Sequence, residues 1–169
     1  MIKICISTCK EYSSVTIPIL LESLFKNEIK EDDILIVEGN NESESIENKN
    51  NLTTVKANHN SFELTSLIEV CEKNIYSEKW LLLHDTCVVG PNFKNKLNEI
   101  KDKFINYDRI ALKPFPSMSI GLYDFKFLLK YKDLLLKYKN PITKNIEETK
   151  KAKGVAFKSE DVLLWDHQK

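Results

Sequence analysis

The sequence predicts an α/β fold in which a mainly parallel central sheet is flanked by helices. Three observations predict it. Short apolar runs suited to strands recur along the chain, at 2–6, 34–37, 52–55, 80–83 and 110–112. Segments with apolar residues at helical spacing lie between these runs. Strands that alternate with helices in this way are typical of right-handed βαβ crossovers, which build parallel sheets.

The first half of the chain gives the clearest elements. Ile2, Ile4 and Ile6 alternate with less apolar residues, as in a strand. A polar break at 7–14 precedes a predicted helix from Thr16 to Asn27, with Pro18 tolerated in its first turn. The continuous apolar run at 34–37 suits a strand that is covered on both faces.

The remaining elements follow the same logic. Residues 39–51 are polar and acidic and are expected to form a loop, whereas helices are expected at 64–75, 93–104 and 124–138. Residues 139–154 are Lys-rich with Pro141 and Gly154, and are predicted to be either a loop that closes over a site or a plain surface connector. A last short helix is expected from Ser159, a suitable N-cap.

Length and charge restrict the class of protein. A chain of 169 residues is the size of one domain. Its 25 basic and 25 acidic residues give zero formal charge, which argues against a nucleic-acid binder or a polybasic membrane-surface protein. It has no apolar run long enough to cross a bilayer and no secretory leader pattern. Its four cysteines form no CxxC pair, so free thiols in a soluble cytoplasmic protein are expected.

Polar residues follow three of the predicted strands. The segments are Ser7–Tyr12, Glu38–Asn40 and His84–Cys87. Ligands of open parallel sheets bind at the carboxyl ends of the strands, so these segments are candidate site residues. The glycine patterns GxGxxG, GxxxxGK[ST] and GxSxG are absent from the sequence, which disfavours a dinucleotide-binding Rossmann enzyme, a P-loop nucleotidase and an α/β-hydrolase.

The order of these segments resembles that of the GT-A fold glycosyltransferases, in particular the family-2-like enzymes. The matching stretches are ISTCKEY at 6–12, ILIVEGN at 34–40, ANHN into FEL at 57–64, and WLLLHDTCVVGPNF at 80–93. The resemblance implies one Rossmann-like GT-A domain over residues 1–169. Residues 1–95 would be the half that binds the nucleotide sugar, and residues 96–169 a minimal acceptor-side half.

The resemblance also implies a donor site. Thr8, Glu11 and Glu38 would hold the nucleobase and ribose of a nucleotide-diphosphate sugar, with a lean towards a uridine nucleotide. His84-Asp85-Thr86 stands where the family has its DxD motif, so that one carboxylate remains. The segment 62–65, where the family often has a basic residue for the diphosphate, has none.

A divalent cation would neutralise the anionic leaving diphosphate, and oxygen-rich sites suit manganese or magnesium. Asp85 and His84 are the expected metal ligands, with His167 as a third candidate. Asp85 could instead bond a sugar or ribose hydroxyl, and both residues could simply cap the strand end.

The resemblance places the catalytic base of an inverting transfer at Asp161, with Glu160 beside it. Acidic residues in the first turn of a helix also favour the helix dipole without any catalytic role. The expected activity is sugar transfer to a glycan or polysaccharide precursor. A partner protein or a second copy of the chain could complete the minimal acceptor-side half. The alternatives are a GT-A-like binding module without turnover and a metal-independent transferase.

Overall fold

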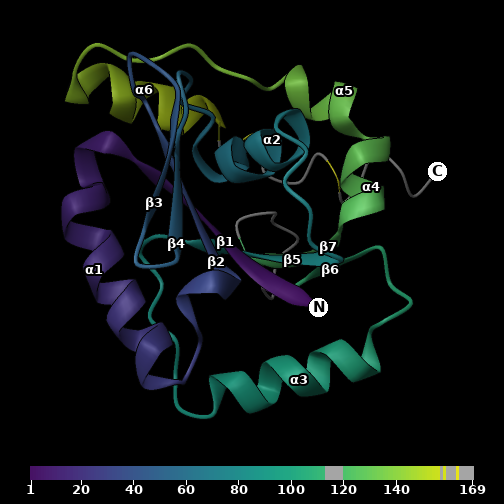
Figure 1. The fold of residues 1–169 in the computed structure, drawn as a ribbon. Coiled ribbons are helices and arrows are strands. Elements are labelled where there is room, and N and C mark those ends of the chain that lie inside the picture. Colours follow the sequence, from purple (N-terminus) through teal and green to yellow (C-terminus); the bar gives the residue numbers. More distant parts are fainter. Residues whose placement is uncertain (113–119, 157, 159–162, 164–169) are drawn as a thin grey trace.

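The central feature of the computed structural model, which describes residues 1–112, 120–156, 158 and 163, is a sheet in the order β3-β4-β2-β1-β5-β7-β6 (Figure 1). The strands are β1 (Ile2–Cys9), β2 (Ile34–Gly39), β3 (Ser45–Lys49), β4 (Leu52–Lys56), β5 (Lys79–His84), β6 (Arg109–Ala111) and β7 (Gly121–Asp124).

The sheet is mixed. β1 pairs in parallel with β2 and β5, and β2 pairs in parallel with β4. The outer pairs β3·β4, β5·β7 and β6·β7 are antiparallel. The α/β class is therefore confirmed, whereas the expectation of a mainly parallel sheet holds only for the four central strands.

Helices cover both faces of the sheet. α1 (Lys10–Lys26) and α3 (Phe93–Lys103) lie on one face, and α2 (Thr65–Glu72), α4 (Phe125–Lys130) and α5 (Lys132–Leu136) lie on the other (Figure 1). The strand period of two divides the core accordingly. Ile4 and Ile6 of β1 pack with α1, whereas Cys5 between them packs with α2.

α1 begins earlier than the sequence predicts. β1 continues to Cys9 and α1 starts at Lys10, so the expected polar break is absent at this point of the described chain. Pro18 therefore lies inside the helix rather than in its first turn. Pro18 has no N–H for the carbonyl of Ser14, and its own position on α1 is exposed.

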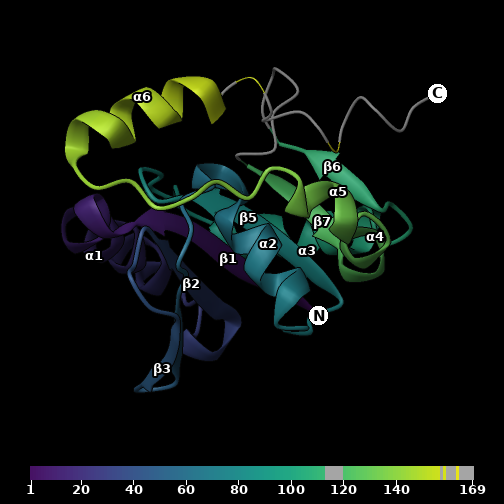
Figure 2. The same cartoon turned by 90° about the horizontal axis from the view of Figure 1, so that it is seen from above.

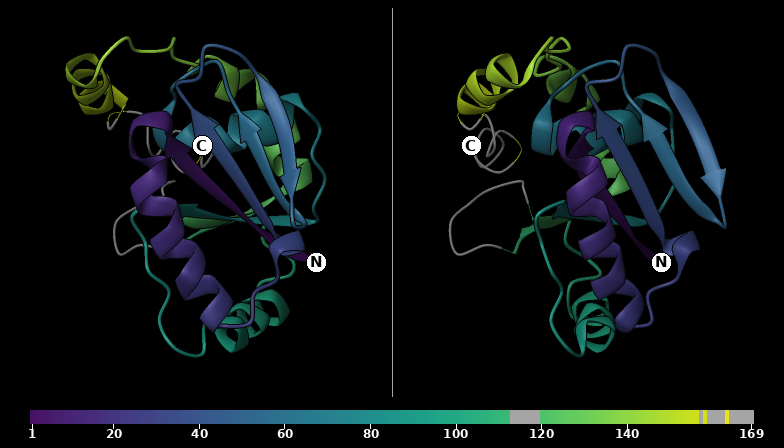
Figure 3. Two further views of the ribbon diagram at one scale, coloured as in Figure 1. Left: turned by 60° about the vertical axis from the view of Figure 1, so that its left-hand side comes forward. Right: turned by 90° about the vertical axis from the view of Figure 1, so that its left-hand side faces the viewer.

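Two segments expected to be loops carry regular structure. Residues 39–51 include β3, which forms an antiparallel hairpin with β4 at the edge of the sheet. The Lys-rich segment 139–154 contains most of α6 (Ile146–Ala156), so it is neither an open loop nor a plain connector. α6 lies near the start of α1 (Figures 2 and 3).

The predicted helix over 124–138 is divided. Asp124 caps α4 by accepting hydrogen bonds from the backbone of Lys126 and Phe127 at 2.8 and 3.2 Å. The helix is interrupted at Tyr131 before α5 begins. Two short 3-10 helices, Glu31–Asp33 and Phe62–Leu64, precede β2 and α2. Among the described helices, none is long and apolar enough to cross a membrane.

Candidate functional site

A cavity of about 190 Å³ opens at the carboxyl ends of β1 and β5. α1 leaves the end of β1 on one face of the sheet, whereas α2 leads into β5 on the other. The two connections diverge at this point, and such a topological switch point is where open α/β sheets bind ligands. The cavity is lined by Ser7, Thr8, Cys9, Tyr12, Thr16, Phe62, Glu63, His84, Asp85, Thr86 and Lys153.

Asp85 joins the ends of the two strands and the first turns of α1. Its Oδ2 accepts a hydrogen bond from the Thr8 hydroxyl at 2.8 Å and another from the Thr16 hydroxyl at 2.9 Å. Its Oδ1 lies 3.0 Å from Nδ1 of His84. Burial by itself raises the pKa of Asp85, but the bonds from His84 and Thr8 outweigh it and hold that pKa below its ordinary value.

His84 lies between two carboxylates. Its Nδ1 faces Asp85, and its Nε2 lies 2.9 Å from Oε1 of Glu63. The hydroxyl of Thr86 is 2.8 Å from the same Nδ1. The bonds to Asp85 and then to Glu63 raise the pKa of His84 to about 9, against the opposing effect of burial. A pKa this high favours the imidazolium at neutral pH, although the backbone N–H of Thr86, at 3.3 Å, also faces Nδ1.

These residues do not fit the divalent metal expected from the sequence. Oδ2 of Asp85 already accepts two hydrogen bonds, Oδ1 lies 3.0 Å from Nδ1 of His84, and both nitrogens of His84 face carboxylates. An imidazolium has no lone pair for a metal ion. The Thr86 hydroxyl is directed to His84. His84 thus places a positive charge beside Asp85, where the cation was expected.

Two functional candidates were missed by sequence reasoning. Glu63, in the turn before α2, is 5% exposed and lines the cavity. Lys153 of α6 brings its Nζ to 3.9 Å from Oε1 of Glu63. Nothing in the sequence around Glu63 indicates that its side chain is buried. No local pattern distinguishes Lys153 from the other lysines of α6.

The other predicted donor-site residues lie at the same edge of the sheet but do not line the described cavity. Glu38, at the end of β2, accepts a hydrogen bond from the Ser13 hydroxyl. Glu11, in the first turn of α1, accepts from the side-chain amide of Asn40 and contacts the thiol of Cys9. Of the residues predicted from the strand ends, the structure brings Thr8, His84 and Asp85 together and leaves Glu11 and Glu38 beside them.

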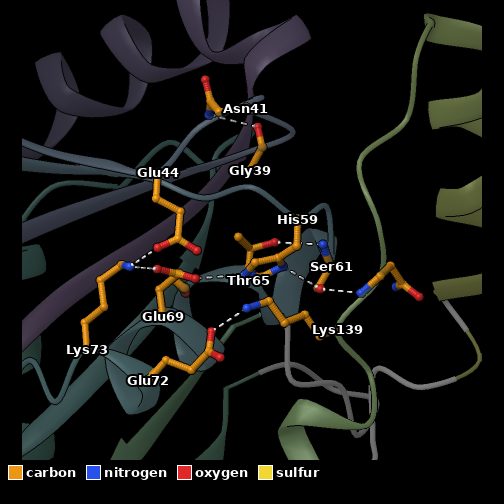
Figure 4. A network of polar contacts seen from close by, with 12 residues as sticks. Gly39, Asn41, Glu44, His59, Ser61, Thr65, Glu69, Glu72, Lys73 and Lys139 are labelled. Carbon is orange, nitrogen blue, oxygen red and sulfur yellow. Dashed lines mark hydrogen bonds and ion pairs between the residues drawn. The ribbon is translucent and has the colours of Figure 1, made fainter.

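A second polar cluster connects the segment before α2 to α2 itself (Figure 4). Ring atoms of His59 and carboxylate oxygens of Glu69 and Glu72 come within 4.8 Å of one another, as metal ligands would. Amines already fill this cluster. Lys73 pairs with Glu69 at 3.2 Å, and Lys139 pairs with Glu72 at 2.7 Å.

The role of this second cluster is structural. His59 bonds the Ser61 hydroxyl at 2.8 Å through Nδ1 and Glu69 at 3.0 Å through Nε2. These bonds hold the segment that leads into the 3-10 helix Phe62–Leu64, which contains Glu63, against α2. The cluster therefore holds the cavity wall in place.

Three predicted residues, Glu160, Asp161 and His167, lie outside the described residues, so the expected base and third metal ligand remain predictions. Comparisons with known proteins assign no family to the chain: no family model matches it, and no curated protein matches it with significance.

Proposed function

We propose that this protein is a glycosyltransferase that transfers a sugar from a nucleotide-diphosphate donor, with a lean towards a uridine nucleotide, to a glycan or polysaccharide precursor with inversion. One observation carries the proposal. The cavity at the switch point is walled by Ser7–Cys9 and His84–Thr86, the two strand ends on which the resemblance to family-2-like enzymes depends. Segments that are 75 or more residues apart in the sequence thus face one space.

The proposal assigns a role to each wall. Thr8 and Thr16 hold the Asp85 carboxylate, and Asp85 holds His84. Lys153 supplies at the rim the ammonium that the segment 62–65 lacks, so it is the group for the donor phosphates. Asp161, with Glu160 beside it, remains the proposed base for the acceptor hydroxyl. No divalent metal enters this scheme, because the described groups that would bind it are engaged with one another.

A second function is favoured by one specific feature. The Asp85 carboxylate contacts three protein groups, Thr8, Thr16 and His84, which suits a rigid binding module as well as an enzyme. In that case the protein would bind a nucleotide or sugar without turnover.

The test is a nucleotide-release assay on the purified chain with a panel of uridine, guanosine, cytidine, adenosine and thymidine diphosphate sugars, with glycan acceptors. We expect release with one nucleotide class, retained in EDTA. Asp161→Asn should abolish release and leave donor binding intact, and Lys153→Met should weaken donor binding. Lys151→Met is the matched control, since Lys151 is an exposed lysine of the same helix. Donor binding without nucleotide release would establish the binding module. If the protein neither bound the donors nor released nucleotide, both functions would be overturned.

A further inference from the structure

The outermost strand, β3, has a free edge. It pairs with β4 alone among the described strands, and four of its five residues are exposed. The turn between the two strands consists of Asn50 and Asn51, whose φ values of 50° and 66° are typical of a tight two-residue hairpin turn. An edge strand of this kind offers unpaired backbone groups to another strand.

The register of the hairpin determines which backbone groups face this edge. A two-residue turn is closed by a hydrogen-bonded pair, which is here Lys49 and Leu52. Hydrogen-bonded and non-hydrogen-bonded positions alternate along a strand, so Glu47 and Lys49 direct their backbone N–H and C=O groups to β4. Ile46 and Asn48 therefore direct theirs to the free edge.

β3 has few of the features that normally block such an edge. Its sequence, SIENK, contains no proline, and its register with β4 is continuous, without a bulge. Its one large apolar residue, Ile46, is 54% exposed. Glu47 and Lys49 are its only charged residues, and their charges are opposite in sign. The edge is thus protected by charge alone, which excludes only those strands whose charges do not match.

From these features we propose that β3 pairs in antiparallel fashion with β3 of a second copy of the chain, so that one continuous sheet crosses both copies. Such a two-fold contact uses the same surface on each copy. With Asn48 opposite Asn48 of the second copy, Glu47 faces Lys49 of the second copy, and Lys49 faces its Glu47. These opposite-charge pairs lie at non-hydrogen-bonded positions, where side chains come closest. Glu47 also pairs with Lys56 of its own copy at 2.6 Å, and a carboxylate can accept from both ammonium groups.

Charge also selects between this register and its neighbours. With Ile46 opposite Asn48 of the second copy, the two Glu47 carboxylates would lie directly opposite each other, which is destabilising. With Ile46 opposite Ile46, Glu47 would face Ser45 and would gain no cation. Among the registers in which Ile46 and Asn48 pair through the free edge, the one centred on Asn48 therefore matches the charges.

The inference goes beyond the proposed function and does not rest on it. β4 and β2 separate β3 from β1 in the sheet, so the walls of the cavity take no part in the contact. β3 also lies well away from α6 (Figure 2). Because only one short strand pairs, the contact is smaller than that of a permanent dimer, so the dimer should be reversible and depend on concentration.

Sedimentation equilibrium over a range of protein concentrations tests the pairing. Lys49→Glu should raise the dissociation constant of the dimer about 10-fold or more, because both opposite-charge pairs become like-charge pairs. Glu47→Lys should do the same. An equal mixture of these two variants should associate again, since each then meets the opposite charge on the other. Lys96→Glu, at an exposed lysine of α3, is the matched control and should leave the dissociation constant unchanged.

A proline variant tests the backbone part of the contact. Asn48→Pro removes an N–H that faces the free edge and none that bonds β4, so the hairpin should persist and the dimer should be lost. Asn48→Ala is its control, because both variants lose the side-chain bond from Thr53 at 2.8 Å but only the alanine keeps the N–H. The melting temperatures of the diluted variants check that each is folded. A protein that stays monomeric at millimolar concentration, or a dimer that survives both Lys49→Glu and Asn48→Pro, would overturn the inference.

Discussion

Asn40 and Thr143 lie 103 residues apart in the sequence and share three hydrogen bonds. The Asn40 side-chain amide donates to the Thr143 carbonyl at 3.1 Å, and its oxygen accepts from the Thr143 backbone N–H at 2.6 Å and hydroxyl at 3.2 Å. Asn40 follows β2 at a φ of 68°, a conformation that asparagine tolerates well. Asn40 fastens the segment before α6 to the end of β2, and Asn140 of the same segment bonds Asn60 and Ser61, so that these contacts together support α6 and Lys153.

Replacing Asn40 should loosen α6. Asn40→Ala removes the three bonds to Thr143 and the bond to Glu11, and it puts at positive φ a residue that tolerates this conformation less well than asparagine, so we expect a loss of about 1–3 kcal/mol in unfolding free energy. Amide exchange in α6 should rise more than in β1. Asn50→Ala is the control, because Asn50 also has a positive φ, of 50°, but lies exposed in the β3–β4 turn. Equal effects of the two substitutions would contradict the role given to Asn40.

The stability of the protein should fall in mild alkali. The folded pKa of His84, about 9, lies above its ordinary value of 6.5, so its contribution is complete below pH 6.5 and is lost as the pH rises through 9. The groups that face it are Glu63 and Asp85, with Lys153 beside Glu63. Urea unfolding at intervals from pH 6 to 9.5 should show a decrease on the order of 1–3 kcal/mol. The His84→Gln variant should lack this part of the decrease. If the unfolding free energies of the variant and the unaltered protein fell in parallel with pH, the decrease could not be assigned to His84.

Asp85 and Glu63 should act at the other end of the pH range. Burial by itself would raise the pKa of both carboxyl groups, but hydrogen bonds in the folded protein lower both pKa values below those of the unfolded chain. The stability that the two groups confer is therefore complete at a pH above their unfolded pKa values and is lost as the pH falls through their folded pKa values. Asp85→Asn should therefore reduce the loss of stability in acid. The same urea series, continued from pH 6 down to pH 3, measures it.

Manganese should not stabilise the protein. A ligand at about 100 times its dissociation constant would add about 2.7 kcal/mol, which a thermal-shift experiment detects readily. Because the oxygens of Asp85 are engaged, we expect the same melting temperature in manganese, in magnesium and in EDTA. A manganese-dependent rise that disappears in Asp85→Ala would reinstate the metal site expected from the sequence.

Two glycines should respond oppositely to alanine. A Cβ on Gly39, at the end of β2, would come within 2.9 Å of the His59 carbonyl oxygen and 3.3 Å of the Thr65 methyl group. Gly39→Ala should therefore cost about 1–3 kcal/mol. Gly154, in α6, has nothing within 4 Å of such a Cβ, so Gly154→Ala should stabilise by about 0.5–1 kcal/mol. Thermal unfolding of both variants checks the pair, and a stabilised Gly39→Ala would show that the turn can yield.

The sequence predicts the buried part of the fold well. Ile34–Val37 and Trp80–Leu83 are continuous apolar runs because both faces of the central strands are covered, so the pattern itself reports their position. The sequence does not predict β3, because four of its five residues are exposed at the sheet edge and are mostly polar. The sequence does not predict α6 for a similar reason, since Thr149 and Ala156 are its only buried residues.

The same distinction applies to the site. Thr8, His84 and Asp85 are predictable, because polar residues after buried strands meet at one edge of a parallel sheet. Glu63 and Lys153 are not, because their approach depends on how the turn before α2 and the late helix pack. That His84 lies between two carboxylates also follows only from the packed structure.

The long-range fastening of α6 has a consequence for biosynthesis. The strand ends and turn that form the floor of the cavity lie within the first 86 residues, whereas Lys153 is synthesised 67 residues later. Chains fold from the amino terminus during synthesis, at about 5–20 residues per second. A nascent chain should therefore expose the floor of the cavity, with Glu63 lacking the ammonium of Lys153, for several seconds before α6 is made.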